Sequence, residues 1–270
     1  MNIIYLHQYF TLPSASGGTR SYDLATSFVA KGHKVIVVSA TSDKKLKNGK
    51  LWNVINKDGL EIHYTYMPYS NEMGYIHRMW VFFKFLWLST YRILGIKADV
   101  VLATSTPLTI GIPALVKKWF GRTPYIFEVR DVWPEAVIAI GAIKSKWMQK
   151  MLYWLEEVIY KNASAIVPLS VDMQKSIVNR YPQFSKKADV VIENISEINR
   201  FQNDVIAIDL KDKIGVEPRF AMLYAGTFGR VNGIEYVVEL AKKTIDIDAG
   251  LVYILIGGGV KKEDVRQQAR

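Results

Sequence analysis

The chain has 270 residues, of which 50% are hydrophobic and 22% are charged, a composition typical of a folded globular protein. It contains no cysteine, which excludes disulfide bonds and thiolate metal sites and fits a reducing cytoplasm. The formal net charge of +10 favours a nucleic acid, an anionic membrane surface or a phosphorylated ligand as the partner. Because the sequence has no nucleic-acid-binding motif, we expect one of the other two partners.

Short β-branched segments alternate with segments of helical period along most of the chain. The first segment lacks the basic flank and cleavage site of a signal peptide, so we interpret it as a buried strand. The predicted strands are residues 2–8, 34–40, 100–104, 125–129, 165–169 and 190–192. This alternation predicts βαβ units, in which a parallel sheet carries helices on both faces. Residues 51–55 and 60–66 flank a turn that ends in Asp58-Gly59, and they are predicted to form an antiparallel hairpin.

Residues 9–20 connect the first predicted strand to the first predicted helix. The connection is too long for a dinucleotide-binding turn, and it ends in Gly17, Gly18 and Arg20. Glycine backbones let a ligand approach closely, the helix N-terminus adds partial positive charge, and Arg20 adds a full charge. We therefore predict that these three residues bind a diphosphate. The alternative is an ordinary helix start with a solvent-exposed arginine.

Residues 75–97 combine cations with many aromatic side chains and contain no acidic residue. The cations are Arg78, Lys84, Arg92 and Lys97. The apolar run within this segment is too short to cross a bilayer and is interrupted by Lys84. We expect the segment to be a helix that lies on an anionic leaflet. The alternative is a helix buried in the domain, with its cations extending to solvent.

Charged residues follow the predicted strand 125–129, at the end where ligands of open parallel sheets bind. Asp131 and Glu135 are candidates to orient an acceptor hydroxyl or to take its proton. Arg130 is a candidate to hold a phosphate or to contact the acceptor. The alternative is an ion pair between Arg130 and Asp131, followed by a helix cap.

Hydroxyl side chains close the preceding predicted strand, because Ser105 and Thr106 follow residues 100–104. They are candidates for contacting an acceptor. Capping of the helix that follows Pro107 is the favoured interpretation of this segment.

A polar stretch after residue 192 interrupts the alternation. The predicted organisation is an N-terminal domain over residues 1–193, a linker over 194–218 and the start of a second α/β domain over 219–270. In this second domain, Gly226 and Arg230 lie on the first loop after a strand and could face a donor phosphate, with an ordinary tight turn as the alternative. Since two strands and a helix do not cover a parallel sheet, we expect this domain to be incomplete.

Three motifs in this order resemble family 4 glycosyltransferases. They are Gly17-Gly18-Thr19-Arg20, Arg130-Asp131-Val132-Trp133-Pro134-Glu135 and Tyr224-Ala225-Gly226. The second motif is similar to members that build bacterial surface polysaccharides such as capsule and O-antigen. The resemblance implies the fold class α/β of GT-B type: an N-terminal Rossmann-like parallel-sheet domain on the acceptor side and a second, donor-binding Rossmann-like domain. It also implies retention of anomeric configuration, a UDP- or GDP-linked sugar donor, and no metal or other cofactor.

The resemblance places Gly17 and Gly18 at the donor diphosphate and Asp131 beside the acceptor. Two departures stand against it. The family commonly carries an arginine and a lysine on the first loop of its second domain, where this chain has Thr227 and Asn232 and only Arg230 could replace the charge. A glutamate pair that holds the donor would lie beyond residue 270. We therefore expect this chain alone to stabilise a departing nucleoside diphosphate weakly.

The expected function is a cytoplasmic glycosyltransferase, peripheral on the inner face of the cytoplasmic membrane. Its substrates would be a nucleotide-sugar and a lipid-linked saccharide acceptor. Two alternatives stay open: a non-catalytic binding protein of the same fold, and a nucleotide-sugar epimerase of similar fold.

Overall fold

The computed structural model describes residues 1–15, 17–68, 75–139, 141, 143–196, 198, 220–229, 232–248 and 250–269. The chain divides into two compact units. The first is built from residues within Met1–Tyr69 and Gly74–Glu197, and the second mainly from residues within Ile198–Arg270. The predicted linker, residues 194–218, lies for the most part outside the described residues.

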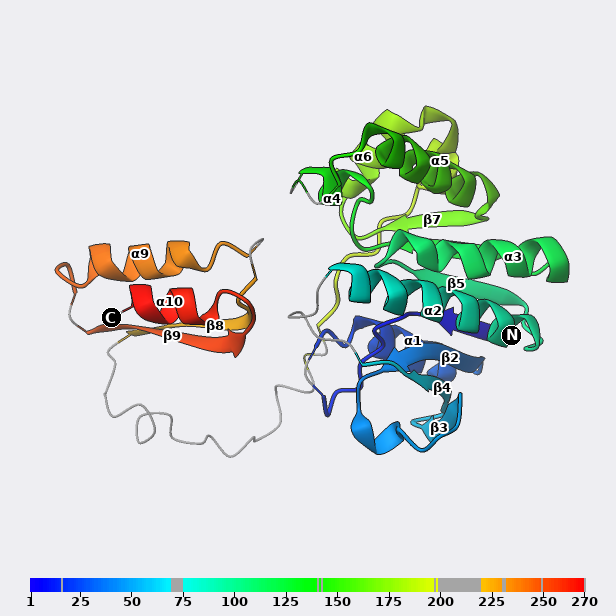
Figure 1. Cartoon of the computed structure of the whole chain (residues 1–270), viewed down its shortest axis with the longest axis horizontal. Helices are drawn as coiled ribbons and strands as arrows, with labels where there is room; N and C mark the ends of the chain where they lie inside the picture. The colour runs from blue at the N-terminus through cyan, green and yellow to red at the C-terminus, as the bar shows by residue number, and fades with distance from the viewer. Residues whose placement is uncertain are drawn as a thin grey trace. The chain divides into compact units, whose positions relative to one another are not determined.

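The first unit is built on one sheet of seven strands, ordered β3-β4-β2-β1-β5-β6-β7 (Figure 1). All neighbouring strands pair in parallel except β3 and β4, which are antiparallel. The strands are β1 Asn2–Leu6, β2 Lys34–Thr41, β3 Asn53–Lys57, β4 Leu60–Tyr66, β5 Val100–Thr104, β6 Tyr125–Val129 and β7 Ala165–Pro168. The predicted parallel sheet is therefore confirmed. Its inner strands β1, β2, β5 and β6 are mostly apolar, as burial on both faces requires.

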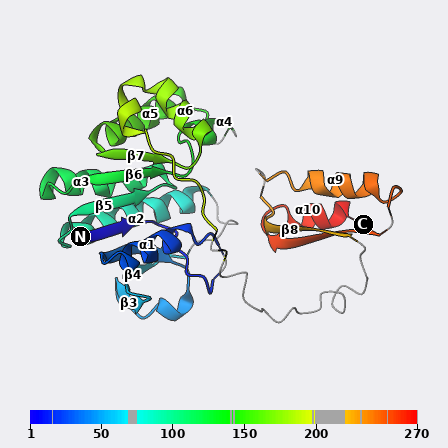
Figure 2. The ribbon, with the colours of Figure 1, turned by 180° about the vertical axis from the view of Figure 1, so that it is seen from behind.

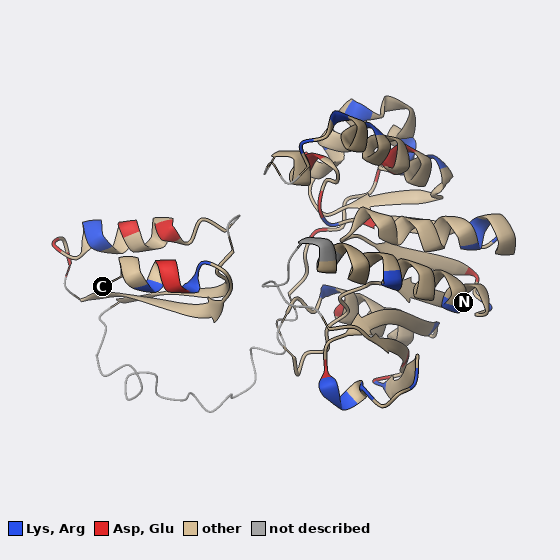
Figure 3. Ribbon diagram, viewed as in Figure 1, with Lys and Arg blue, Asp and Glu red and all other residues tan. Residues whose placement is uncertain are grey.

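Alternate residues of β1 enter two separate cores, one on each face of the sheet. Ile3 and Tyr5 belong to one core, and Ile4 and Leu6 belong to the other. This follows from the two-residue period of a strand. Figure 3 shows that charged residues lie mainly on helices and loops and rarely on the strands of this sheet.

Helices cover both faces of the sheet. Helix α1 covers the face that Figure 2 shows in front, whereas α2 and α3 cover the opposite face, which is in front in Figure 1. Helix α2 packs beside α3, and α3 packs beside α5. The helices of this unit are α1 Arg20–Ala30, α2 Tyr75–Leu94, α3 Gly111–Gly121, α4 Glu135–Ala139, α5 Lys146–Asn162 and α6 Val171–Arg180, with short 3₁₀ turns at Lys44–Leu46, Leu108–Ile110 and Pro182–Lys187.

One predicted strand is wrong. Residues 190–192 form no strand, although the Ile192 amide donates to the Pro168 carbonyl at 3.1 Å. Val190 is exposed, so the segment has a β-branched composition but no apolar face to bury. The predicted strand 2–8 also ends early, at Leu6, which leaves His7 and Gln8 beyond the sheet edge.

The predicted hairpin is confirmed, with its first strand shifted to Asn53–Lys57. Asp58 and Gly59 form its two-residue turn, and both have positive φ, at 51° and 77°. Positive φ at both central residues is the signature of a type I′ turn. The turn rests on α1, because the Tyr22 hydroxyl donates to Asp58 Oδ2 at 2.6 Å and a Cβ on Gly59 would lie 2.6 Å from Val29 Cγ1.

The second unit has a parallel pair of strands, β8 Phe220–Thr227 and β9 Leu251–Gly258, with helices α9 Glu235–Thr244 and α10 Lys262–Gln268. Its small core contains Phe228, Ile234, Val238 and Val265. The predicted βαβ order is confirmed. Residues 262–268 are mainly charged and polar, but they form helix α10, because Val265 gives them a residue to bury against this core.

Candidate active site

Polar residues that follow three neighbouring strands, β1, β5 and β6, gather at the carboxyl edge of the first unit's sheet. They surround a cavity of about 350 Å³, which we call the charged cavity. It lies beyond β1, β5, β6 and β7, where the order of strands reverses and open α/β sheets bind ligands. Its lining residues are His7, Tyr9, Thr11, Gly17, Gly18, Thr106, Arg130, Asp131, Leu169 and Asn194. The structure thus brings together five of the predicted site residues: two glycines, a threonine, an arginine and an aspartate.

The glycine pair forms a wall of bare backbone. Gly17 has φ +136°, a conformation that favours glycine. At Gly18, an added Cβ would lie 3.8 Å from Arg130 Nη2, so the guanidinium is next to this backbone. A ligand in the cavity would meet the glycine backbone and the arginine on the same side.

Arg130 is oriented by a neutral histidine. Arg130 Nη1 lies 3.2 Å from His7 Nε2, and since arginine only donates, the imidazole nitrogen must accept. Burial lowers the pKa of His7 to about 3, and the nearby positive charge of Arg130 acts in the same direction. His7 therefore stays uncharged at neutral pH, with its proton on Nδ1, which has no hydrogen-bond partner among the described residues.

Asp131 is an exposed carboxylate in the cavity wall, and the Thr106 hydroxyl donates to its Oδ2. One carboxylate oxygen is thereby fixed from the neighbouring strand end. The other oxygen can accept from a substrate hydroxyl.

Ser105 and Thr104 tie β5 to β6 beneath the cavity. The Arg130 amide donates to Ser105 Oγ at 2.9 Å, and the Thr104 hydroxyl donates to Glu128 Oε2 at 2.9 Å. The favoured interpretation of this segment as a helix cap is wrong, because the 3₁₀ turn after Pro107 has no side-chain cap. Ser105 is buried and does not line the cavity, so its contribution is to hold the Arg130 backbone.

Arg20 has a different environment from the one predicted. Its guanidinium forms a buried ion pair with Glu128, at 2.9 Å between Nη2 and Oε1. It also donates to the Ile192 carbonyl at 2.7 Å and to the Glu193 carbonyl. Arg20 is only 4% exposed, donates to protein oxygens and does not line the charged cavity. The prediction that Arg20 binds a diphosphate there is therefore not supported by its position.

Glu135 also lies outside the cavity. Its Oε2 accepts from Ser176 Oγ at 2.9 Å and from Arg180 Nη2. Arg180 in turn pairs with the buried Glu156 at 3.2 Å. Glu135 therefore connects the start of α4 to α6, and the structure does not bring it to Asp131.

Gly226 lies in β8 of the second unit, where it pairs with Gly257. A Cβ there would lie 2.8 Å from the Tyr224 hydroxyl oxygen, and that hydroxyl donates to the Thr227 carbonyl at 3.1 Å. Local packing thus already accounts for a glycine at this position. Arg230 lies outside the described residues.

Sequence reasoning missed His7 and Asn194, which both line the charged cavity. The four histidines of the sequence show no metal-ligand spacing, so spacing does not single out His7. A better signal for His7 was its position, as the first polar residue beyond a buried parallel strand.

The family model described as a glycosyl transferase 4-like domain matches residues 17–192. No curated protein sequence matches the chain. Sucrose-phosphate synthase from Thermosynechococcus elongatus is similar in structure, with a TM-score of 0.67 at 16% identity over 98% of this chain and 65% of that one. The chain therefore spans slightly less than two thirds of that protein's length.

Two further solved structures extend the comparison. The catalytic domain of starch synthase IV from Arabidopsis thaliana, bound to ADP and acarbose, has a TM-score of 0.66 at 10% identity, covering 98% of this chain and 70% of that one. UDP-N-acetylglucosamine 2-epimerase from Rickettsia bellii has a TM-score of 0.51 at 12% identity, covering 100% and 64%. At these identities the likeness concerns the fold alone. It confirms the predicted α/β fold class of GT-B type.

Proposed function

This chain belongs to the glycosyl transferase 4-like family, and we propose that it transfers a sugar from a nucleotide-sugar to a saccharide acceptor. The observation that carries the proposal is the charged cavity, in which bare glycine backbone, an arginine and a carboxylate meet at the strand ends of the matched region. A phosphate group and a nucleophilic hydroxyl are the two chemical groups that this set can serve. The ADP bound to starch synthase IV supports a nucleotide-sugar donor.

In this proposal the donor diphosphate lies against Gly17 and Gly18, and Arg130 supplies the positive charge that Arg20 was predicted to supply. Neutral His7 holds Arg130 without competing for the anion. A hydrogen-bond donor that is already fixed where negative charge develops on the leaving group lowers the activation barrier of sugar transfer. It does so because the protein needs no reorganisation during the reaction.

Asp131 orients the acceptor hydroxyl and accepts its proton, and the Thr106 hydroxyl holds the carboxylate in place. We further propose retention of anomeric configuration, independence from metal, and a UDP- or GDP-linked donor, as the family resemblance implies. The first unit would be the acceptor-side domain, and the second unit, with Gly226 and Arg230, the donor side.

The aromatic surface of α2 supports a lipid-linked acceptor of surface polysaccharide synthesis. Trp80, Trp87 and Tyr91 are 70%, 75% and 78% exposed and, at spacings of seven and four residues, share one helix face. The opposite face packs into the core through Val81 and Phe85. Further exposed aromatic side chains on α3 and α5 are Trp119, Phe120, Trp147 and Trp154. Within the described residues, no helix has the length and apolar character to cross a membrane.

We propose that this α2 face contacts an anionic leaflet peripherally. Apolar contact survives salt, whereas attraction by cations such as Lys84 is screened. The chain should bind phosphatidylglycerol vesicles in flotation, more weakly at high salt. Replacing Trp80, Trp87 and Tyr91 by serine should abolish binding, and the control Tyr236→Ser, at an exposed aromatic residue of the second unit, should not.

The test of the diphosphate site is titration calorimetry with UDP and GDP. Arg130→Gln should weaken binding by about 1.5–3 kcal/mol, because a charge-assisted hydrogen bond is lost. Gly18→Val should also weaken it, and since the nearest atom to a Cβ there is 3.8 Å away, the fold can accept this change. Arg122→Gln, at an exposed arginine, is the matched control. Unchanged affinity in both cavity variants would refute the diphosphate assignment.

A nucleotide-sugar epimerase is the second candidate, because the similar structures include a UDP-N-acetylglucosamine 2-epimerase. The family match favours the transferase. Product analysis by NMR distinguishes them: a transferase forms a new glycosidic bond only when an acceptor is added, whereas an epimerase converts the donor without one. Nucleotide binding with neither product would indicate a non-catalytic binding protein.

A further inference from the structure

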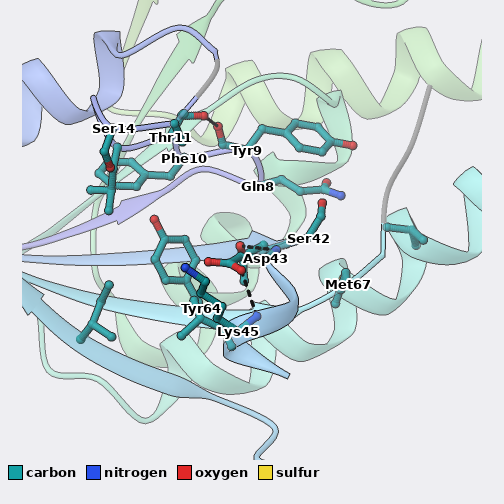
Figure 4. A pocket seen from close by; sticks show the side chains of 17 residues that line it. Gln8, Tyr9, Phe10, Thr11, Ser14, Ser42, Asp43, Lys45, Tyr64 and Met67 are labelled. Atoms are coloured by element: carbon teal, nitrogen blue, oxygen red, sulfur yellow. Dashed lines mark hydrogen bonds between the residues drawn. The ribbon is translucent and has the colours of Figure 1, made fainter. Parts of the chain in front are cut away.

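A second cavity adjoins the charged cavity in the same unit. It has a volume of about 670 Å³ and lies between the segment that follows β1 and the ends of β2 and β4 (Figure 4). Tyr9 and Thr11 line both cavities, so the two are separated by one stretch of chain. We call it the neutral cavity, for the reasons that follow.

A buried amide in its wall has an unused donor. Gln8 is 1% exposed and lines the neutral cavity, and its Nε2 has no hydrogen-bond partner among the described residues. Its backbone is fixed, because the Gln8 carbonyl accepts from the Ala40 amide at 3.1 Å and from Ser39 Oγ at 3.2 Å. A buried N–H group without a hydrogen-bond partner reduces the stability of the fold. We therefore expect a ligand oxygen to accept the hydrogen bond from Gln8 Nε2.

The walls around this amide are mostly apolar, although hydroxyl side chains such as Ser14, Ser42 and Tyr64 also line the cavity. Phe10, Met67 and Val81 are buried and line the cavity. Among the described lining residues, charge occurs only at Asp43 and Lys45, which are exposed, of opposite sign and joined by a hydrogen bond from the Lys45 amide to Asp43 Oδ1 at 2.9 Å. The charged cavity, by contrast, contains Arg130. The neutral cavity therefore selects for an uncharged ligand with an apolar surface and a strong acceptor oxygen.

We propose that the neutral cavity binds an N-acetylated sugar ring of the acceptor, with Gln8 Nε2 donating to the acetamido carbonyl. The acetamido group combines the two features that the cavity demands, since its carbonyl is a strong acceptor and its methyl group is apolar. Phe10 and Met67 offer contact surface for that methyl group. The assignment to the acceptor rests on the proposed transferase function, because Tyr9 and Thr11 separate this cavity from the one that Asp131 lines.

The test is an NMR titration of the isotope-labelled chain with matched glycosides. The probes are methyl N-acetylglucosaminide and methyl N-acetylgalactosaminide, each against the corresponding methyl hexoside. At least one N-acetylated glycoside should bind about tenfold or more tightly than its hydroxyl counterpart. Gln8→Leu should remove most of that preference, and Gln183→Leu, at an exposed glutamine that lines neither cavity, should keep it.

UDP binding is measured on the same samples, to separate this inference from the proposed function. Loss of the acetamido preference with UDP binding intact supports Gln8 as the specificity residue. If Gln8→Leu is unfolded, Gln8→Met keeps a similar length, loses the donor, and should show the same loss. The inference is overturned if neither N-acetylated glycoside is preferred, or if both Gln8 variants retain the preference, as they would were Nε2 satisfied by water alone. Absence of UDP binding alone would count against the transferase and not against this cavity.

Discussion

Two arginines near the carboxyl end of β6 have opposite environments. Arg20 is buried against Glu128 and against backbone carbonyls of residues 192 and 193, which joins α1, β6 and the chain after α6. Arg130, two residues beyond Glu128, lines the charged cavity, with neutral His7 as its neighbour. The same residue type thus stabilises the fold in one place and is available to a ligand in the other. The two environments differ because the guanidinium of Arg20 already forms an ion pair with a buried carboxylate.

The largest expected effect concerns the cavity side of this comparison. Asp131→Asn should lower sugar-transfer turnover by about 10²–10⁴-fold, because the acceptor loses its orienting base. The melting temperature should stay close to that of the wild type, because Asp131 is exposed. Turnover near the wild-type value would make Asp131 a surface residue without a catalytic role.

The buried side of the comparison should respond in stability instead. Arg20→Met should lower the free energy of unfolding by about 3–5 kcal/mol in urea titrations, because it leaves Glu128 buried without its ion-pair partner. The double variant Arg20→Met/Glu128→Gln should recover part of the loss, since the stranded charge is removed. If Arg20→Met lowers the free energy of unfolding by less than about 1 kcal/mol, the ion pair is hydrated. Arg20 would then not differ from Arg130 in its contribution to the fold.

His7, the neighbour of Arg130, should make the stability of the fold depend on pH. Its pKa is lowered to about 3 in the fold, so between this value and its ordinary value of 6.5 the unfolded chain takes up a proton that the folded chain does not. Stability should therefore fall as the pH is lowered, with a contribution of about 2 kcal/mol lost at pH 5 relative to pH 8. His7→Gln should lack this part of the pH dependence in urea titrations. Parallel curves for the two proteins would mean that His7 is not buried as a neutral group.

The smallest effect is expected at Glu135. Its side chain is about half exposed and shares Arg180 with the buried Glu156. Glu135→Gln should change the free energy of unfolding by less than about 1 kcal/mol. Transfer activity should be unchanged, whereas a fall comparable to that of Asp131→Asn would restore Glu135 as a catalytic candidate.

The sequence allowed the sheet and half of the site to be predicted, for one reason. Parallel strands have buried apolar runs, and the polar residues that follow them meet at one edge, which brings Gly18, Thr106, Arg130 and Asp131 together. The environments of Arg20 and Glu135 could not be predicted, because their partners lie 108 and 45 residues away in the chain. Local sequence specifies that a charged side chain is present but not which distant group of opposite charge pairs with it.

The hairpin turn restricts which residues can replace Gly59 during evolution. Gly59 must adopt a left-handed backbone, and it must also lack a side chain, because Val29 of α1 occupies the space that a Cβ would need. Asparagine, which adopts positive φ more readily than most residues, meets only the first condition. A mutation here would displace the helix whose first residue is Arg20. Homologues that lose this glycine should therefore carry a smaller residue at position 29, so that the two positions change together although neither lines the charged or the neutral cavity.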